Sequence, residues 1–134
     1  MRRTRPRVLV VDDADRHLTD SLAESLGGCD VDVARDVVDA IYRIDTASDP
    51  YHLIFCDLAR GDLPGPELWA YLSITRSDAA GRMVFVASEK LRPETMEFVR
   101  TTANTFVQLP QRRVGAGARP LLRNAPPQPP SLRG

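Results

Sequence analysis

Four polar side chains stand at the ends of short apolar runs, where they could meet and do chemistry together. They are Asp12, Asp13, Asp57 and Ser88. Three carboxylates close to one another repel unless a cation joins them. Oxygen ligands at an open site suit Mg²⁺, and a carboxylate beside Mg²⁺ can attack phosphorus to form an aspartyl phosphate. The pattern therefore predicts a cation site that accepts a phosphoryl group.

The same aspartates also allow a purely structural interpretation. Asp12 and Asp13 can cap the helix that follows them, and Asp57 can close a loop. Each residue taken alone favours neither interpretation. The three together, at the ends of matched strands, favour the cation site.

The positions of these side chains depend on a predicted alternation of strands and helices. Apolar or alternating runs predict strands, and stretches with an apolar stripe predict helices between them. Strands are expected at 7–11, 29–34, 52–56, 82–87 and 105–109, and helices at 14–27, 36–47, 66–75 and 93–103. This order predicts an α/β fold with a doubly wound parallel sheet covered on both faces. Sites in such sheets form outside the carboxyl ends of the strands, where the aspartates stand.

Four segments resemble the receiver domain of bacterial two-component response regulators, the CheY-like superfamily. VLVVDDAD is similar to the family's first strand with its acidic pair, and LIFCDLARGDLPGPEL to the phosphoacceptor strand and loop. MVFVAS is similar to the fourth strand, and ANTFVQLP to the fifth. The resemblance covers residues 7 to about 110. It implies a flavodoxin-like, five-stranded parallel sheet with strand order 2-1-3-4-5.

The resemblance implies a role for each residue of the site. Asp57 would be the phosphoacceptor. Asp12, Asp13 and Asp57 would hold Mg²⁺ together with the backbone carbonyl of Ala59. Ser88 would supply the hydroxyl that hydrogen-bonds the phosphoryl group.

The implied function is signalling rather than enzymatic turnover. A histidine kinase or phosphotransfer protein would phosphorylate Asp57, and the chain would act as a stand-alone receiver in a phosphorelay. Phe106 corresponds to the aromatic that swings inward when Ser88 moves. The surface of the fourth helix, which begins at Pro93, and the fifth strand would then bind a downstream protein. A homodimer is left open.

The sequence departs from the receiver pattern near the site. Leu109 stands where the family has a lysine that pairs with the acidic pocket, and Glu89 stands where it has a small residue. One cation fewer and one anion more should both weaken phosphoryl binding. Lys90 at the pocket rim and Arg112 are candidates to replace the missing charge. The alternative is a pseudo-receiver, a protein-interaction module that works without phosphorylation.

Charge divides the chain into three parts. Residues 8–110 contain all 18 acidic residues and nine of the 18 Lys and Arg, whereas the arm at 1–6 and the tail at 111–134 are basic. The tail is rich in Arg, Pro and Gly, which predicts a largely disordered segment and makes a final helix doubtful. Nucleic-acid binding by these ends is not expected, because no aromatic residues interleave the arginines.

The remaining features indicate a cytoplasmic protein without membrane association. No apolar run is long enough to cross a bilayer, and no apolar signal core follows the basic N-terminus. The two cysteines, Cys29 and Cys56, suggest no disulfide framework. Cys56 is expected in the core, on the opposite face of its strand from Asp57, and His17 is expected to be solvated.

Overall fold

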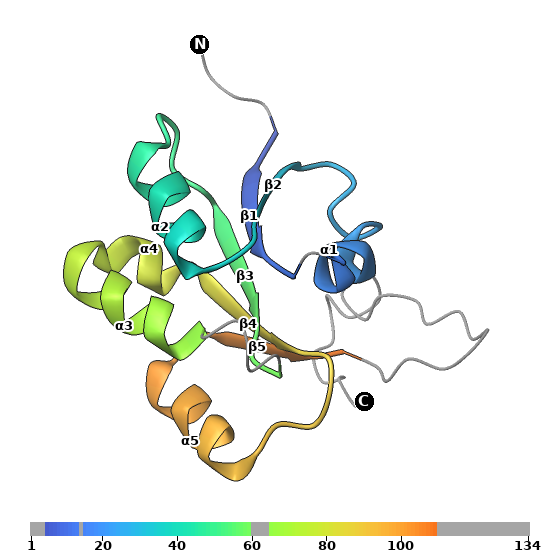
Figure 1. Cartoon of the computed structure of the whole chain (residues 1–134), viewed down its shortest axis with the longest axis vertical. Helices are drawn as coiled ribbons and strands as arrows, with labels where there is room; N and C mark the ends of the chain where they lie inside the picture. Colours follow the sequence, from blue (N-terminus) through green and yellow to red (C-terminus); the bar gives the residue numbers. More distant parts are fainter. Residues whose placement is uncertain (1–4, 14, 60–64, 110–134) are drawn as a thin grey trace.

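Five parallel strands form the centre of the computed structural model, which describes residues 5–13, 15–59 and 65–109 (Figure 1). The strands are β1 (Arg7–Val11), β2 (Asp30–Ala34), β3 (Leu53–Asp57), β4 (Met83–Ala87) and β5 (Thr105–Gln108). They pair in the order β2-β1-β3-β4-β5, and every pair is parallel. The predicted α/β fold and its strand order are confirmed.

Helices cover both faces of this sheet. They are α1 (His17–Leu22), α2 (Val37–Thr46), α3 (Gly65–Thr75), α4 (Ser77–Gly81) and α5 (Pro93–Thr102). Figure 1 shows α1 on one side of the sheet and the other four helices on the opposite side. The strand order explains this, because right-handed crossovers toward β2 and toward β5 leave the sheet on opposite faces. We call the two faces the α1 side and the α2–α5 side.

The strands are apolar throughout because both of their faces are buried. Leu9, Ile54 and Phe85 belong to the core layer that includes Leu68 and Leu72 of α3. The alternate strand residues form a second layer with α1, and its members are Val8, Val10, Leu18, Leu22, Leu26, Phe55, Val84, Val86 and Leu109. Residues of each strand therefore alternate between the two layers, as the pleat requires.

The first helix is much shorter than predicted. It ends at Leu22, and hydrogen-bonded turns replace helix up to Gly28. Leu18, Leu22 and Leu26 are nevertheless all buried. The apolar stripe therefore predicted correctly which residues pack on the sheet, but it did not require a continuous helix, because a turn also places Leu26 inward.

The short helix α4 has no counterpart among the predicted helices, because its sequence, SDAAG, carries no apolar stripe. The other elements agree with the predicted ones to within a residue or two, which is the usual uncertainty of such boundaries. Asp36 caps α2 by accepting a 2.7 Å hydrogen bond from the backbone N–H of Asp39.

Several predictions concern residues that the structure does not describe. They are residues 1–4 of the basic arm predicted at 1–6, Arg112, and the tail at 111–134 with its doubtful final helix. These stay predictions. Within the described ranges, no helix is both long enough and apolar enough to cross a membrane.

Candidate functional site

The carboxyl ends of neighbouring strands bring the predicted site residues to one edge of the sheet. Val11 of β1 pairs with Cys56 of β3, so Asp12 and Asp57 come next on strands that lie side by side. Asp57 in turn pairs with Val86 of β4, which lies two residues before Ser88. The sheet register thus brings together residues that are more than 30 positions apart in the sequence.

Asp57 is a buried carboxylate held by backbone groups. Its side chain is 3% exposed. Oδ1 accepts hydrogen bonds from the backbone N–H groups of Ala59, at 2.9 Å, and Ser88, at 3.3 Å. Among the described residues, no hydrogen bond or ion pair reaches Oδ2. The carboxylate therefore joins the loop after β3 to the loop after β4, and no described residue contacts its second oxygen.

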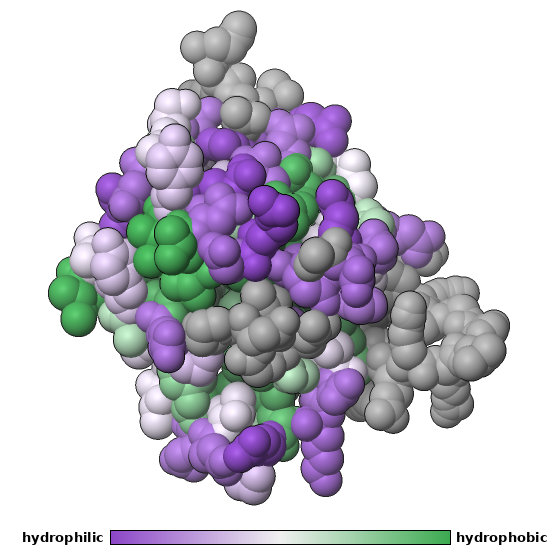
Figure 2. Space-filling view, in the orientation of Figure 1, coloured by the Kyte–Doolittle hydropathy of each residue, from purple (hydrophilic) through white to green (hydrophobic). Residues whose placement is uncertain are grey.

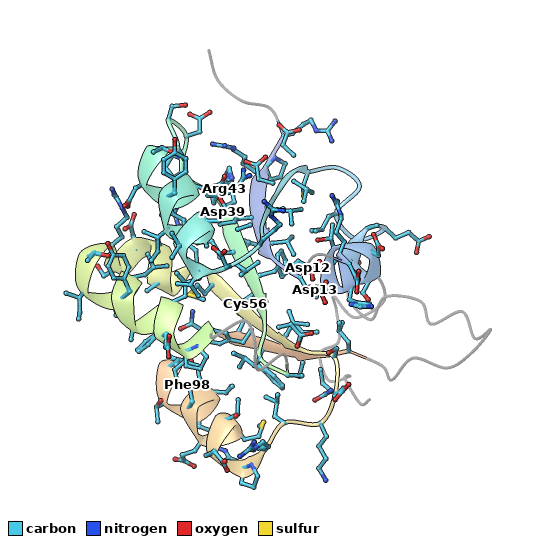
Figure 3. All side chains as sticks on the ribbon, viewed as in Figure 1. Asp12, Asp13, Asp39, Arg43, Cys56 and Phe98 are labelled. Carbon is cyan, nitrogen blue, oxygen red and sulfur yellow. The ribbon has the colours of Figure 1, made fainter. Side chains whose placement is uncertain are left out.

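Asp12 is fully engaged with the start of α1. Its Oδ1 accepts from the backbone N–H groups of Asp13, at 2.8 Å, and Leu18, at 3.1 Å. Its Oδ2 accepts from both the backbone N–H and the hydroxyl of Thr19, each at 2.6 Å. These four donors occupy the roughly four lone-pair sites of a carboxylate. Figure 3 shows Asp12 and Asp13 beside this helix.

Asp13 contacts the same helix through His17. Its Oδ1 accepts from the backbone N–H of His17 at 3.2 Å, and its Oδ2 lies 2.8 Å from Nδ1 of the His17 ring. The prediction that His17 is solvated is confirmed, because its side chain is 61% exposed. The imidazole also pairs with a carboxylate of the predicted site.

The described residues do not fit the three-carboxylate Mg²⁺ site that the resemblance implies. Carboxylate oxygens are suitable ligands for Mg²⁺, but Asp12 has no lone pair left for one. No three His, Cys, Asp or Glu side chains within the described ranges are grouped so that they could hold a metal ion. The Mg²⁺ prediction stays a prediction.

No described residue takes the place of the missing lysine. Leu109 is 6% exposed and packs in the α1-side layer, and its backbone N–H donates to the carbonyl of Ala87 at 2.9 Å. Glu89 and Lys90 are both exposed. Lys90 makes no ion pair with any residue in the described part of the chain. Among the described residues, backbone N–H groups contact the Asp57 carboxylate and no cationic side chain does.

The two apolar residues near the site lie on the α2–α5 side. Cys56 is 1% exposed and belongs to that core layer, which confirms it as a core residue. Burial, followed by the nearby carboxylate of Asp57, raises the pKa of its thiol to about 12. Phe106 pairs with Phe85 across β4 and β5 and is half-buried against the same layer.

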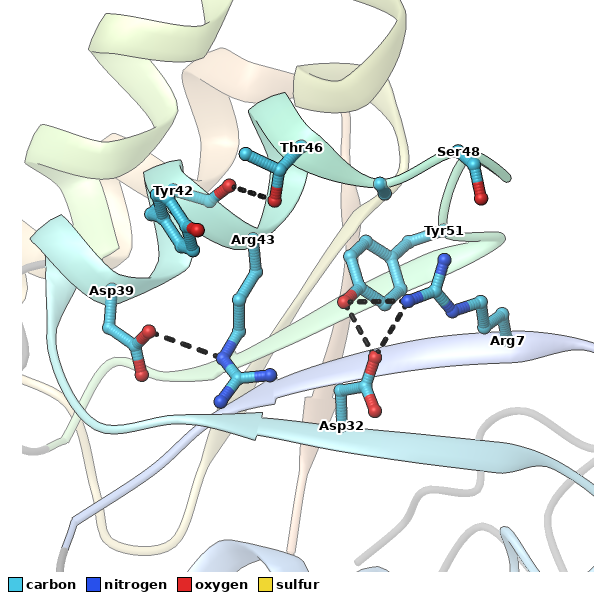
Figure 4. Close-up of a pocket in the computed structure, with 9 residues that line it drawn as sticks. Arg7, Asp32, Asp39, Tyr42, Arg43, Thr46, Ser48 and Tyr51 are labelled. Carbon is cyan, nitrogen blue, oxygen red and sulfur yellow. Dashed lines mark hydrogen bonds and ion pairs between the residues drawn. The ribbon is translucent and has the colours of Figure 1, made fainter.

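A polar cluster that the sequence analysis missed lies toward the amino ends of the strands (Figure 4). Arg7 donates to Oδ2 of Asp32 at 3.0 Å and lies over the ring of Tyr51, whose hydroxyl donates to the same oxygen at 2.7 Å. Burial favours a higher pKa for Asp32, but the hydrogen bonds from Tyr51 and Arg7 outweigh it and hold that pKa below its usual value. The strand predicted at 29–34 includes Asp32, but only the sheet register, which places Asp32 opposite Leu9, shows which residues it contacts.

This cluster forms one wall of a pocket of about 300 Å³ beside α2. Arg43 and Asp39 of α2, which form an ion pair at 3.2 Å, line the same pocket. The lining thus contains two arginines and two aspartates, and each charge has a partner of opposite sign. The pocket has no excess charge that would select an ion.

Apolar side chains are exposed on the outer faces of α2 and α3, and Figure 2 shows hydrophobic residues at the surface over this side of the molecule. Val38 and Tyr42 of α2 are 76% and 65% exposed, and Ile74 of α3 is 86% exposed. An ion pair at 2.7 Å joins Asp45 of α2 to Arg76, the residue that follows α3. Nothing in the described part of the chain covers this surface.

Comparison with solved structures places this fold among receiver domains. The chain is similar to a CheY-like receiver domain protein from Methanospirillum hungatei JF-1, with 20% identity, 81% of this chain and 85% of that chain covered, and a TM-score of 0.62. It is also similar to the receiver domain of the Francisella response regulator 1452, with 22% identity, 80% and 86% covered, and a TM-score of 0.58. It is similar, too, to the chemotaxis protein CheY4 of Vibrio cholerae, with 19% identity, 81% of this chain and 90% of that chain covered, and a TM-score of 0.62.

The chain therefore has the fold of the CheY-like response regulator receiver domain, and the predicted resemblance is confirmed at the level of the fold. No family model matches the sequence. No curated protein matches it either.

Proposed function

We propose that this chain is a receiver module of two-component signalling and that Asp57 accepts a phosphoryl group from a phosphohistidine. The observation that carries the proposal is the geometry of the Asp57 carboxylate. Two backbone N–H groups hold Oδ1 and fix the orientation of the side chain, while Oδ2 has no partner among the described residues. An oriented carboxylate with one available oxygen suits a nucleophile.

The transfer step follows from this orientation. Oδ2 of Asp57 attacks phosphorus, and the new O–P bond forms as the N–P bond of the phosphohistidine breaks. The imidazole nitrogen of the partner protein keeps the electron pair of that bond and takes up a proton. Ser88, whose backbone N–H already contacts Asp57, supplies the hydroxyl for the transferred group. We assign no cation to this step.

The signal would pass from Ser88 to β5 and α5. Gln108 of β5 donates from Nε2 to the carbonyls of Ala87, at 3.0 Å, and Glu89, at 3.4 Å, so the loop that contains Ser88 is tied to β5. A movement of Ser88 toward a phosphoryl group would shift this loop. Phe106, half-buried in the same strand, would then change its exposure, and a partner protein would bind the altered surface of α5 and β5.

A second candidate function is a pseudo-receiver that binds its partner without phosphorylation. Two observations favour it. Leu109 places an apolar side chain where a lysine would balance the phosphoryl charge, and Asp12 has no free lone pair to hold a cation. A dianionic group beside Asp57 would then meet little positive charge, which raises the free energy of the phosphorylated state.

Intact-mass measurement separates the two functions. The protein is incubated with acetyl phosphate and Mg²⁺, beside the variants Asp57→Asn and Leu109→Lys. One added phosphoryl group in the wild type, absent in Asp57→Asn, supports the phosphoacceptor. No added mass in the folded wild type would contradict it. In that case, an added group in Leu109→Lys would show that the missing lysine is the reason, as the pseudo-receiver predicts.

A further inference from the structure

The short helix α1 lacks a cap of its own. The residue at its N-cap position is Arg16, which has the left-handed conformation, with φ at 59°, and makes no side-chain hydrogen bond to the helix. A helix leaves its first backbone N–H groups without intrahelical partners. In most helices a Ser, Thr, Asp or Asn at the N-cap accepts from the second or third of them. An arginine side chain has no acceptor and cannot do so.

The acidic pair at the end of β1 supplies the missing acceptors. Asp13 accepts from the N–H of His17, the first residue of α1, and Asp12 accepts from those of Leu18 and Thr19, the second and third. The hydroxyl of Thr19 adds a further bond to Asp12. Asp12 therefore accepts the hydrogen bonds that a capping side chain at the N-cap normally accepts, although it lies four residues before the N-cap. A carboxylate at this position also interacts favourably with the positive, N-terminal end of the helix dipole.

A cation at Asp12 would have to displace one of these donors. The carboxylate is 2% exposed, and Thr19 is 7% exposed. A displaced N–H or hydroxyl would be left buried without an acceptor, which costs more free energy than the loss of an exposed hydrogen bond. We propose that Asp12 is the cap that fastens α1 to the end of β1 and that it is not a ligand of a cation. This role does not depend on whether Asp57 is phosphorylated.

The size of α1 makes the cap important. The helix has six residues, and an isolated helix of that length is not stable in water. Its position depends on the packing of Leu18 and Leu22 against the sheet and on the bonds to Asp12. Asp12 thus helps to position α1 on its face of the sheet.

The substitution Asp12→Asn tests the proposal because the two roles predict opposite signs. Asparagine keeps one acceptor oxygen, and its NH₂ group cannot accept from Thr19. If Asp12 is the cap, the urea midpoint and the Tm fall. If it is only one of several crowded carboxylates, neutralising it relieves repulsion and the midpoint stays or rises. Asp20→Asn, at an exposed position of the same helix, removes the same charge and is the matched control.

Three further measurements complete the test. The change of Tm caused by millimolar Mg²⁺, whatever its size, should be the same in the wild type and in Asp12→Asn. Amide hydrogen exchange at Leu18 and Thr19 should become roughly five- to tenfold faster in the variant, as the loss of a helix cap predicts. If Asp12→Asn does not fold, Thr19→Val should still fold with a lowered urea midpoint.

Two results would overturn the proposal. One is an Asp12→Asn protein as stable as the wild type that no longer responds to Mg²⁺ when the wild type does. The other is an unchanged midpoint in Thr19→Val, since the hydroxyl would then contribute nothing to holding Asp12.

Discussion

Thr19 contacts Oδ2 of Asp12 twice, through its backbone N–H and through its hydroxyl, each at 2.6 Å. Both residues are buried, and seven positions separate them in the sequence. This contact ties the end of the first strand to the first turn of the first helix. Asp12, which the sequence predicts to be a cation ligand, is thereby part of the framework of the fold.

Removing the hydroxyl of Thr19 should destabilise the protein by about 1.5–3 kcal/mol, the range for a buried hydrogen bond to a charged group. Thr19→Val keeps the shape of the side chain, and urea denaturation followed by circular dichroism measures the change. Thr19→Ser keeps the hydroxyl and should lose much less stability than Thr19→Val. In a double-mutant cycle, the effect of Thr19→Val should shrink when residue 12 is already asparagine. Equal effects in both backgrounds would show that the two residues are not coupled.

Gly65→Ala should destabilise the protein by about 1–3 kcal/mol through overpacking. A Cβ at Gly65 would lie 2.8 Å from Sγ of Cys56 and 2.8 Å from Cδ2 of Leu58, so the loop that follows Asp57 would have to shift. Gly81→Ala is the control, because nothing lies within 4 Å of its Cβ position. That change should be neutral or slightly stabilising. Thermal unfolding of both variants would show whether the crowding at Gly65 is real.

Tyr51→Phe should remove part of the alkaline unfolding of the protein. Burial, together with the hydrogen bond to Asp32, raises the pKa of Tyr51 to about 12, above its usual value of 10.0. A raised pKa means that the folded state favours the neutral hydroxyl. Its contribution to stability is complete below pH 10 and is lost as the pH rises toward 12.

The variant should therefore be less stable than the wild type at neutral pH, by about 1.5 kcal/mol for the lost hydrogen bond. The difference should narrow between pH 10 and pH 12. Tyr42→Phe, at a position 65% exposed, is the control and should change neither the stability at neutral pH nor its dependence on pH. Urea midpoints of both proteins measured across this pH range test the prediction. A stability difference between them that stays constant would contradict the raised pKa of Tyr51.

Asn104→Ala should loosen the contact between α3, α4 and β4. Nδ2 of Asn104 donates to the carbonyls of Ala80, at 2.8 Å, and Met83, at 2.9 Å, and its Oδ1 accepts from Nε1 of Trp69 at 3.3 Å. We expect a loss of about 2 kcal/mol, because several partly buried groups lose their partner together.

Trp69 is the single tryptophan of the chain, so its fluorescence reports on this site directly. Its emission should shift to longer wavelength in Asn104→Ala, as water replaces the amide at the indole N–H. Thr105→Ala, at an exposed neighbouring position, should leave the emission unchanged. An unshifted spectrum in Asn104→Ala would mean that the amide does not shape the surroundings of the indole.

Much of the fold follows from local patterns in the sequence. The strands are runs such as VLVV and MVFVA, which are apolar on both faces because helices cover both sides of the sheet. The cap of α2 could also be predicted, because Asp36 and the N–H of Asp39 are three residues apart. These features depend on neighbours in the sequence, so the sequence alone carries them.

At the candidate site, the sequence determines where the residues stand but not which groups they contact. The sequence determined that Asp12, Asp13, Asp57 and Ser88 stand at the carboxyl ends of strands, because apolar runs end there. It did not determine what each carboxylate contacts. Thr19 reaches Asp12, and the N–H of Ser88 reaches Asp57, only because the chain folds back across 7 and 31 positions.

The Arg7, Asp32 and Tyr51 cluster was hidden for the same reason, since its members come from three separate segments that only the register of β1 with β2 and β3 aligns. A carboxylate looks the same in a sequence whether it binds a cation or caps a helix. The donors that surround it decide between the two, and tertiary structure alone supplies those donors.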